Sequence, residues 1–316
     1  MKTIFNDSKG HVFTGISVIL IISFIIIVIL FLNLNYFITE ETNQIIASDN
    51  LKYIVEDYNK NIEVLSYTSL KEISENVIKS KTPLKDSSEE FKKVLNEKLS
   101  NKNKEYLKKY DIKIESNVIS IENSESPEYL KFKTIITVEK DNEKYNNVLE
   151  SKTSVLNLKD PLGILLCSPD PSLSYNETNI LFGNSLSKYL EKRNVENHEN
   201  YINATAPLIL KKCPYDPYIH HGDNHTLADC IKNSYYHESA DGSCYLCRLE
   251  GKPLCPHYGF ETFIIPRANI ENNLSSVSSP DHVVFADNYP GDPYYYFNDS
   301  NKIIFLDSSH KKKYGL

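Results

Sequence analysis

The 316-residue sequence has no tryptophan, a single methionine and only three arginines, Arg193, Arg248 and Arg267. Surfaces that bind nucleic acid rely on clustered basic charge and on arginine forks, and the net charge of −7 does not favour them. The sequence also has no Gly-Lys-Ser/Thr phosphate loop, no Gly-x-Ser-x-Gly elbow and no His-Glu-x-x-His helix. These absences argue against a nucleic-acid partner and against several common enzyme classes.

One long apolar run occupies residues 12–34, where 18 of 23 residues are Ile, Leu, Val or Phe and none is charged. A helix of this length spans about 34 Å, against about 30 Å of membrane hydrocarbon. The run therefore predicts one transmembrane helix that contacts membrane lipid. A cleaved secretory peptide is the alternative, but its apolar region should be shorter and followed closely by a small-x-small site.

The charges that flank this run predict its orientation in the cell membrane. Lys2 and Lys9 precede it, whereas Glu40, Glu41 and Asp49 follow it before the next lysine. Positive residues favour the cytoplasmic side. We therefore expect a single-pass protein with a cytoplasmic leader at residues 1–11 and an extracellular remainder.

Composition changes near residue 160 and divides the expected extracellular part into two domains, 35–160 and 161–316. All six cysteines and 12 of the 14 prolines lie after residue 160, whereas 22 of the 32 lysines lie before it. Asparagine-linked glycosylation sequons show the same asymmetry, because none lies between residues 35 and 160. Five lie in the second domain, and they make candidate glycosylation sites of Asn176, Asn203, Asn224, Asn273 and Asn298.

The first domain carries regular patterns. Apolar residues recur every three or four positions through residues 38–80, which predicts that the membrane helix continues outward as a long amphipathic helix. Ser87 and Glu90 predict a capping box for a second helix to about residue 109. Alternating apolar and polar residues in 111–158 predict an antiparallel sheet of three or four strands, packed on the long helix.

The second domain has little periodicity. Proline, aspartate, tyrosine and cysteine dominate it, and short strands are expected at 260–266, 281–287 and 301–308. The predicted fold class is therefore α+β: a transmembrane helix extended into a long amphipathic helix on an antiparallel sheet, followed by an irregular, mostly β and loop domain.

An even number of cysteines in an external, loop-rich domain favours disulfide bonds. The expected pairs are Cys213 with Cys230, Cys247 with Cys255, and Cys167 with Cys244, although the sequence leaves all fifteen connectivities open.

A metal site is the alternative interpretation of the same region. Cys244, Cys247, Cys255 and His257 provide the three thiolates and one imidazole that zinc accepts. Thiol–disulfide exchange at the Cys-x-x-Cys pair is a third alternative, because Ser243 could cap a helix there. The nearby His220, His221 and His225 are expected to be exposed loop histidines, because Gly222 and Asp223 disfavour a helix.

The N-terminal plan resembles type IV pilin-like proteins of archaea, in which a short lysine-bearing leader ends in Lys-Gly before an apolar helix that runs into a head. The matching residues are Asp7-Ser8-Lys9-Gly10, followed by HVFTGISVILII. Later stretches, such as YYHESADGSCYLCRLEG and CPHYGFETFIIP, are similar to surface proteins of methanogenic archaea. The resemblance makes Gly10 a candidate cleavage site, but Gly15 stands where pilins carry an assembly glutamate.

The resulting functional hypothesis is a membrane-anchored, pilin-like surface protein with a structural, adhesive or pilus-associated role and no catalysis. Its expected partners are other pilin-like or envelope proteins, and it needs no cofactor. The alternative is an envelope zinc-binding or thiol-redox enzyme that uses Cys244, Cys247, Cys255 and His257.

Overall fold

The structure is a computed structural model that describes residues 8–140, 143–196, 198–215, 221, 224–266, 277–286, 294–297, 302–305 and 308–315. Its fold is α+β, as expected from the sequence. The chain divides into one compact unit of Met1–Tyr58 with Lys140–Glu143, and a second of Asn59–Glu139 with Lys144–Leu316. The boundary predicted from composition, at residue 160, falls inside the second unit.

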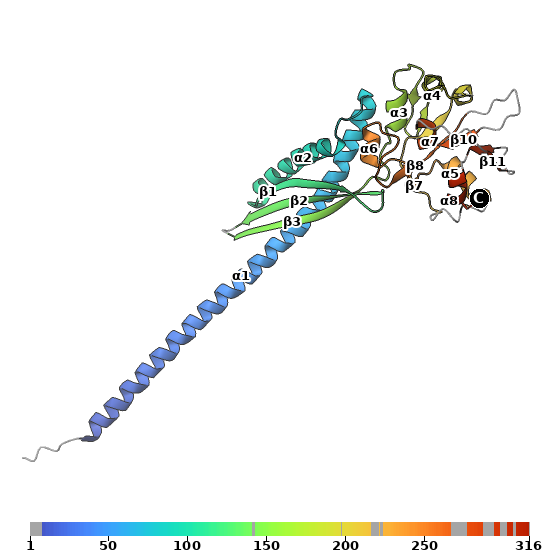
Figure 1. The fold of residues 1–316 in the computed structure, drawn as a ribbon. Coiled ribbons are helices and arrows are strands. Elements are labelled where there is room, and N and C mark those ends of the chain that lie inside the picture. Colours follow the sequence, from blue (N-terminus) through green and yellow to red (C-terminus); the bar gives the residue numbers. More distant parts are fainter. Residues whose placement is uncertain are drawn as a thin grey trace, which may run out of the picture. The chain divides into compact units, whose positions relative to one another are not determined.

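Helix α1 spans Ser8–Ser80 without interruption and ends where the sequence pattern predicts (Figure 1). Its segment Ile16–Tyr36 is long and apolar enough to cross a membrane. The apolar side chains of this segment are exposed, Phe24 to 67%. Such a surface is unfavourable in water, so the segment is consistent with a membrane anchor or a signal sequence.

Within the second unit, the last turns of α1 are amphipathic. Ile62, Leu70 and Val77 are buried on one face, and so is the small Ser74. The Ser74 hydroxyl donates a 2.7 Å hydrogen bond to the carbonyl oxygen of Lys159. This face of α1 therefore belongs to the core of the second unit.

Helix α2 spans Ser87–Tyr110, close to the predicted range, but its cap differs from the predicted one. Asp86 is the N-cap, and its side chain accepts a 2.9 Å hydrogen bond from the backbone N–H of Glu89. The Ser87 hydroxyl instead donates to Oε1 of Glu250 at 2.7 Å. The predicted capping box of Ser87 and Glu90 is therefore wrong, because Ser87 has a long-range partner.

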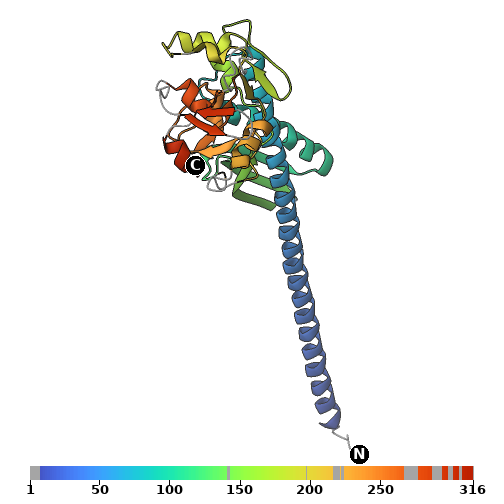
Figure 2. The same ribbon diagram turned by 90° about the vertical axis from the view of Figure 1, so that its right-hand side faces the viewer.

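Strands β1 (Lys113–Asn123), β2 (Tyr129–Lys140) and β3 (Glu143–Ser154) form a sheet in that order. β1 and β2 are antiparallel, with a register shift between Val118 and Ser120 that keeps β1 one strand rather than two. Alternate residues of β2 are buried, as the sequence pattern predicts. Helix α2 lies beside this sheet (Figures 1 and 2), and its Phe91 packs edge-on against Phe132, with ring centroids 5.8 Å apart.

The rest of the second unit consists of short elements. Its described helices are α3 (Leu162–Cys167), α4 (Ser185–Glu191), α5 (Asn224–Asn233), α6 (Tyr245–Leu249), α7 (Asp281–Phe285), α8 (Ser308–Lys313) and a 3-10 turn at His198–Tyr201. Its described strands are β4 (Ser174–Tyr175), β5 (Asn179–Leu181), β6 (Thr205–Pro207), β7 (His237–Ser239), β8 (Gly259–Glu261), β9 (Phe263–Ile264), β10 (Val277–Pro280), β11 (Tyr294–Phe297) and β12 (Lys302–Phe305). They form small sheets in the orders β4-β5-β6, β7-β8 and β11-β12-β10-β9.

Two of the three strands predicted in this region are present, at β8–β9 and β12, but 281–287 is not a strand. Helix α7 begins there, after Pro280. The Asp281 carboxylate accepts hydrogen bonds from the backbone N–H groups of His282 at 2.8 Å and Thr262 at 3.2 Å. These local polar contacts turn the chain and override the apolar Val-Val-Phe pattern.

The guanidinium of Arg248, in α6, is fully buried. Its Nη1 lies 2.6 Å from Asp160 Oδ2 and 2.8 Å from Asp281 Oδ2, and its Nε donates to the Ser243 carbonyl at 3.1 Å. Asp160 follows the β1–β3 sheet in the chain, whereas Asp281 begins α7. Arg248 therefore joins the part of the second unit that contains α2 and this sheet to the part that consists of short elements.

Candidate metal centres

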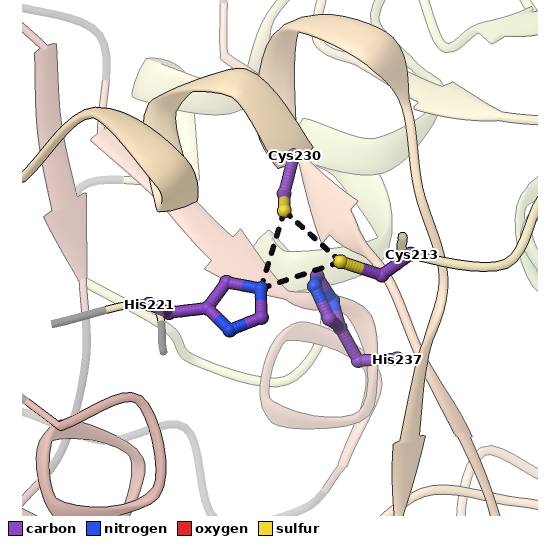
Figure 3. A group of neighbouring side chains, drawn as sticks. All are labelled: Cys213, His221, Cys230 and His237. Atoms are coloured by element: carbon purple, nitrogen blue, oxygen red, sulfur yellow. Dashed lines mark hydrogen bonds between the residues drawn. The ribbon is translucent and has the colours of Figure 1, made fainter. Parts of the chain in front are cut away.

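Four side chains form a first cluster: Cys213, His221, Cys230 of α5 and His237 of β7 (Figure 3). Both sulfurs lie 3.3 Å from Nε2 of His221 and 3.3 Å from each other. One ligand atom of each residue lies within 4.8 Å of all the others. All four side chains are fully buried, so the cluster is an interior site.

The first cluster is walled by aromatic rings. The His221 and His237 rings lie 5.1 Å apart, and each has its centroid 5.4 Å from the ring of Tyr314. Phe263 packs against both His237 and Tyr314. This apolar wall excludes water and leaves the two thiols and two imidazoles facing one another.

The surroundings of Cys213 favour its ionised form. Hydrogen bonding with Cys230, and then with His221 and His237, outweighs burial and lowers the pKa of Cys213 to about 3. A thiolate, not a thiol, is the form that binds a metal. The cluster is therefore poised to donate sulfur to a cation.

The spacing of these atoms fits a tetrahedral metal after a small expansion. Bond lengths of about 2.3 Å to sulfur and about 2.0 Å to nitrogen place two sulfurs roughly 3.8 Å apart, and a sulfur and a nitrogen roughly 3.6 Å apart. The observed 3.3 Å separations are a few tenths of an ångström shorter. The Cys₂His₂ set is one that structural zinc sites use.

A second cluster contains Cys244, Cys247, Cys255 and His257, the four residues that the Cys-x-x-Cys pattern predicts as alternative metal ligands. His257 Nδ1 lies 3.5 Å from the sulfur of Cys244 and 3.7 Å from that of Cys247. The backbone N–H of Cys244 donates to the sulfur of Cys255 at 3.3 Å. The structure thus brings together every residue of this predicted set.

Local structure explains how the second cluster forms. Cys244 is the N-cap of α6, Cys247 lies one turn further, and Gly251, with a φ of +71°, reverses the chain toward Cys255. Gly259 passes so close to Ser243 that a Cβ atom would lie 2.3 Å from its carbonyl carbon. The second cluster is nearer the surface than the first, because His257 is exposed and Cys255 is half-buried.

The pKa values of the three cysteines in the second cluster are shifted in different directions. Hydrogen bonds from Cys244 and Cys247 lower the pKa of Cys255 well below its usual range. Hydrogen bonding with Cys244 and Cys255 raises the pKa of Cys247 far above it. One thiolate is therefore held by two thiols, and a divalent cation would replace the protons of those thiols.

The sixth cysteine, Cys167, belongs to neither cluster. It ends α3 and is buried in an apolar core with Ile164, Phe182 and Leu186. Burial raises its pKa to about 12, which makes it unreactive. Of the three predicted disulfide pairs, the structure brings together the residues of two, Cys213 with Cys230 and Cys247 with Cys255, while all six thiols are free.

Among the three histidines predicted to be exposed, His221 is wholly buried, so the prediction is wrong for this residue. Its imidazole has two cysteine sulfurs within hydrogen-bonding distance, and these polar partners compensate for burial. The side chains of His220 and His225 lie outside the described part of the chain.

The first cluster was not predicted from the sequence. Its ligands are separated by seven, eight and six residues, with no Cys-x-x-Cys pair to mark them. A signal was present, because two cysteines and four histidines lie within the 25 residues from Cys213 to His237. That density predicts a set of ligands only if the intervening residues fold into α5 and its flanking turns.

The other predicted site residues lie away from these clusters. Asn176 and Asn203 are exposed, the latter with a φ of +57°, and Asn224 is the first residue of α5. Asn273 and Asn298 lie outside the described residues. Gly10 lies in the first turns of α1.

Comparisons of the chain with protein-family models, with curated proteins and with solved structures found no match.

Proposed function

We propose that this chain is a membrane-anchored, pilin-like surface protein whose head is stabilised by two structural zinc sites and whose role is structural or adhesive. The observation that carries the proposal is the pair of clusters in which four cysteine and histidine ligand atoms lie within 4.8 Å of one another. Two such sets in one region of short elements fit a fold that relies on metals for its stability.

Metal binding accounts for the arrangement better than three disulfides do. The second cluster holds three cysteines, so one disulfide would leave one of them unpaired, and Cys167 is buried elsewhere. Disulfides also give no role to the histidines. In a zinc site each of these side chains has a function, because two thiolates and two imidazoles, or three thiolates and one imidazole, complete a tetrahedron.

A structural role fits the ligand count better than a catalytic one. Catalytic zinc sites keep one coordination position for water or substrate, whereas each cluster here supplies four protein ligands. Thiol-redox catalysis is also disfavoured. Hydrogen bonding with Cys247 lowers the pKa of Cys244, but hydrogen bonding with Cys255 and burial outweigh it and raise that pKa to about 11. A redox nucleophile needs a lowered pKa instead.

The anchor and its orientation rest on the N-terminal region. The apolar segment Ile16–Tyr36 supplies the membrane helix, and Lys2 and Lys9 before it favour a cytoplasmic N-terminus. The head then lies outside the cell, where the exposed Asn176 and Asn203 are accessible to glycosylation. Other pilin-like or envelope proteins are the partners that this placement offers.

Metal analysis and mass measurement test the zinc assignment. We expect the detergent-solubilised full chain, purified under anaerobic conditions, to contain two thiolate-bound zinc ions per chain. Its mass should not change on reduction, because no disulfide is present. Three disulfides without zinc would overturn the proposal.

Protease added to intact cells tests the topology. We expect it to remove the head and leave a fragment that contains the apolar segment Ile16–Tyr36. A head that stays intact in cells but is cleaved after lysis would place it in the cytoplasm instead.

A further inference from the structure

A third group of ionisable side chains lies outside both cysteine–histidine clusters. Asp241 lies between β7 and α6, His282 in α7 and His310 in α8, and one ligand atom of each lies within 4.8 Å of the others. His282 and His310 are each only 3% exposed, whereas Asp241 is exposed. The group is therefore an interior site that reaches solvent on the side of Asp241.

The imidazole of His282 has no hydrogen-bond partner among the described residues. Its Nδ1 lies 3.7 Å from Glu261 Oε2 and 3.7 Å from Asp281 Oδ1, beyond hydrogen-bonding distance. Buried polar side chains are almost always hydrogen-bonded, and an exception requires an explanation. A bound cation would supply the missing partner for one of these nitrogens.

A buried carboxylate lies behind the two histidines. Glu261 Oε2 is 3.3 Å from His310 Nε2 and 3.0 Å from the Lys313 ammonium, and the Tyr314 hydroxyl donates to Oε1. Metal-binding histidines are typically oriented in this way, by a carboxylate on the ring nitrogen that does not bind the metal. Glu261 is thus placed to hold His310 in position.

When His282 and His310 are neutral, as metal binding requires, the charges around the group leave a negative excess. Three buried carboxylates, Asp160, Glu261 and Asp281, face two buried or half-buried cations, Arg248 and Lys313. Asp241 adds a further negative charge at the surface. A divalent cation would balance this excess.

We propose that Asp241, His282 and His310 bind a divalent transition metal such as Zn²⁺ or Fe²⁺, with Glu261 as a positioning residue for His310. Two imidazoles and one carboxylate form the ligand set of metal sites that keep open positions for water or a small ligand. This site differs from the two cysteine–histidine clusters, which are closed by four protein ligands. It is independent of the zinc assignment proposed for them.

Cobalt titration of the full chain in detergent, after removal of bound metal under anaerobic, reducing conditions, separates the three sites. Cobalt bound to cysteine gives intense sulfur-to-metal charge-transfer absorption, whereas cobalt bound to nitrogen and oxygen gives only weak d–d bands. We expect three cobalt ions per chain, of which two produce charge transfer and the third does not.

Two variants assign the third ion. Asp241→Asn changes an exposed side chain and should leave the fold intact, and His282→Gln removes a buried ligand. Each should weaken binding of the third ion by more than the roughly 10–100-fold that loss of a supporting residue costs. Both should retain the charge-transfer bands, which report that the rest of the head is folded. His198→Gln, a half-buried histidine outside all three groups, is the matched control and should bind three ions.

Two outcomes would overturn the third site. One is a wild-type chain that binds two ions, both with charge transfer. The other is retention of the third ion in both Asp241→Asn and His282→Gln. Loss of the charge-transfer bands with the d–d bands retained would refute the zinc assignment of the cysteine clusters and leave the third site standing.

Discussion

The second unit contains two regions that reach a folded state by different means. Residues 59–139 and 144–160 contain long elements, α2 and the β1–β3 sheet, and bury apolar residues such as Phe91, Leu95 and Ile136. The described elements after residue 160 are at most ten residues long, and this region buries thiols, imidazoles and an arginine beside its apolar core. Apart from charged residues such as Asp160, the first region folds through the hydrophobic effect and regular hydrogen bonds, whereas the second concentrates groups that need partners.

This difference predicts that metal removal acts on one region alone. Replacing Cys213 and Cys230 together by serine should prevent metal binding in the first cluster. The second region should then lose much of the folding free energy that structural zinc supplies, which is about 10–16 kcal/mol at neutral pH. Amide hydrogen exchange followed by mass spectrometry should show protection lost in α5, β7 and α6 and retained in α2. Equal loss in both regions would remove the distinction. Cys167→Ala, a buried cysteine outside the clusters, is the control that should keep both metals.

The next largest effect is expected where the two regions meet. Arg248→Met leaves Asp160 and Asp281 as buried charges without their partner, and breaking such a pair costs about 3–5 kcal/mol. Urea unfolding of the metal-loaded chain should show this loss. Adding Asp160→Asn and Asp281→Asn to Arg248→Met should recover most of it. A single variant as stable as wild type would mean that the ion network does not join the regions.

A smaller effect, confined to the first region, is expected for Leu95→Ala. Leu95 is fully buried in α2, and the cavity should cost about 3 kcal/mol. The exposed Leu107 lies on the same helix, so Leu107→Ala should change stability by no more than about 0.5 kcal/mol. Metal content should be unchanged in both variants. Loss of metal from Leu95→Ala would show that the clusters depend on the first region.

The smallest effect is expected at the start of α2. Asp86→Ala removes the side-chain acceptor for the Glu89 N–H and should cost about 1 kcal/mol, whereas Asp86→Ser should retain most of the stability. Thermal unfolding of the two variants measures the difference. Equal stability of the alanine and serine variants would mean that the cap contributes nothing.

The first region could be predicted from sequence because its patterns are local and repeat along the chain. The apolar spacing of α1, the range of α2 and the alternation in β2 are all visible without the structure. The cap at Asp86 was not predicted correctly, because the preference of Ser87 for Glu250 depends on a residue 163 positions away. Local rules cannot include such a partner.

The second region could be predicted only where its ligands are close in sequence. The four residues from Cys244 to His257 lie within one short stretch, so their spacing alone places them together. The ligands Cys213, His221, Cys230 and His237 meet only after α5 and β7 have formed. Asp241, His282 and His310 are further apart still, and the helix of His282 replaces the strand that was expected there.

Arg248 follows Cys247 directly in the chain, and this position ties two events in maturation to each other. Occupation of the second cluster would fix α6, and fixing α6 delivers the guanidinium to two carboxylates from Asp160 and Asp281. A chain without metal in this cluster would leave those two buried acids without their counterion, so metal binding beside Cys247 and charge pairing at Arg248 would be two parts of one folding step.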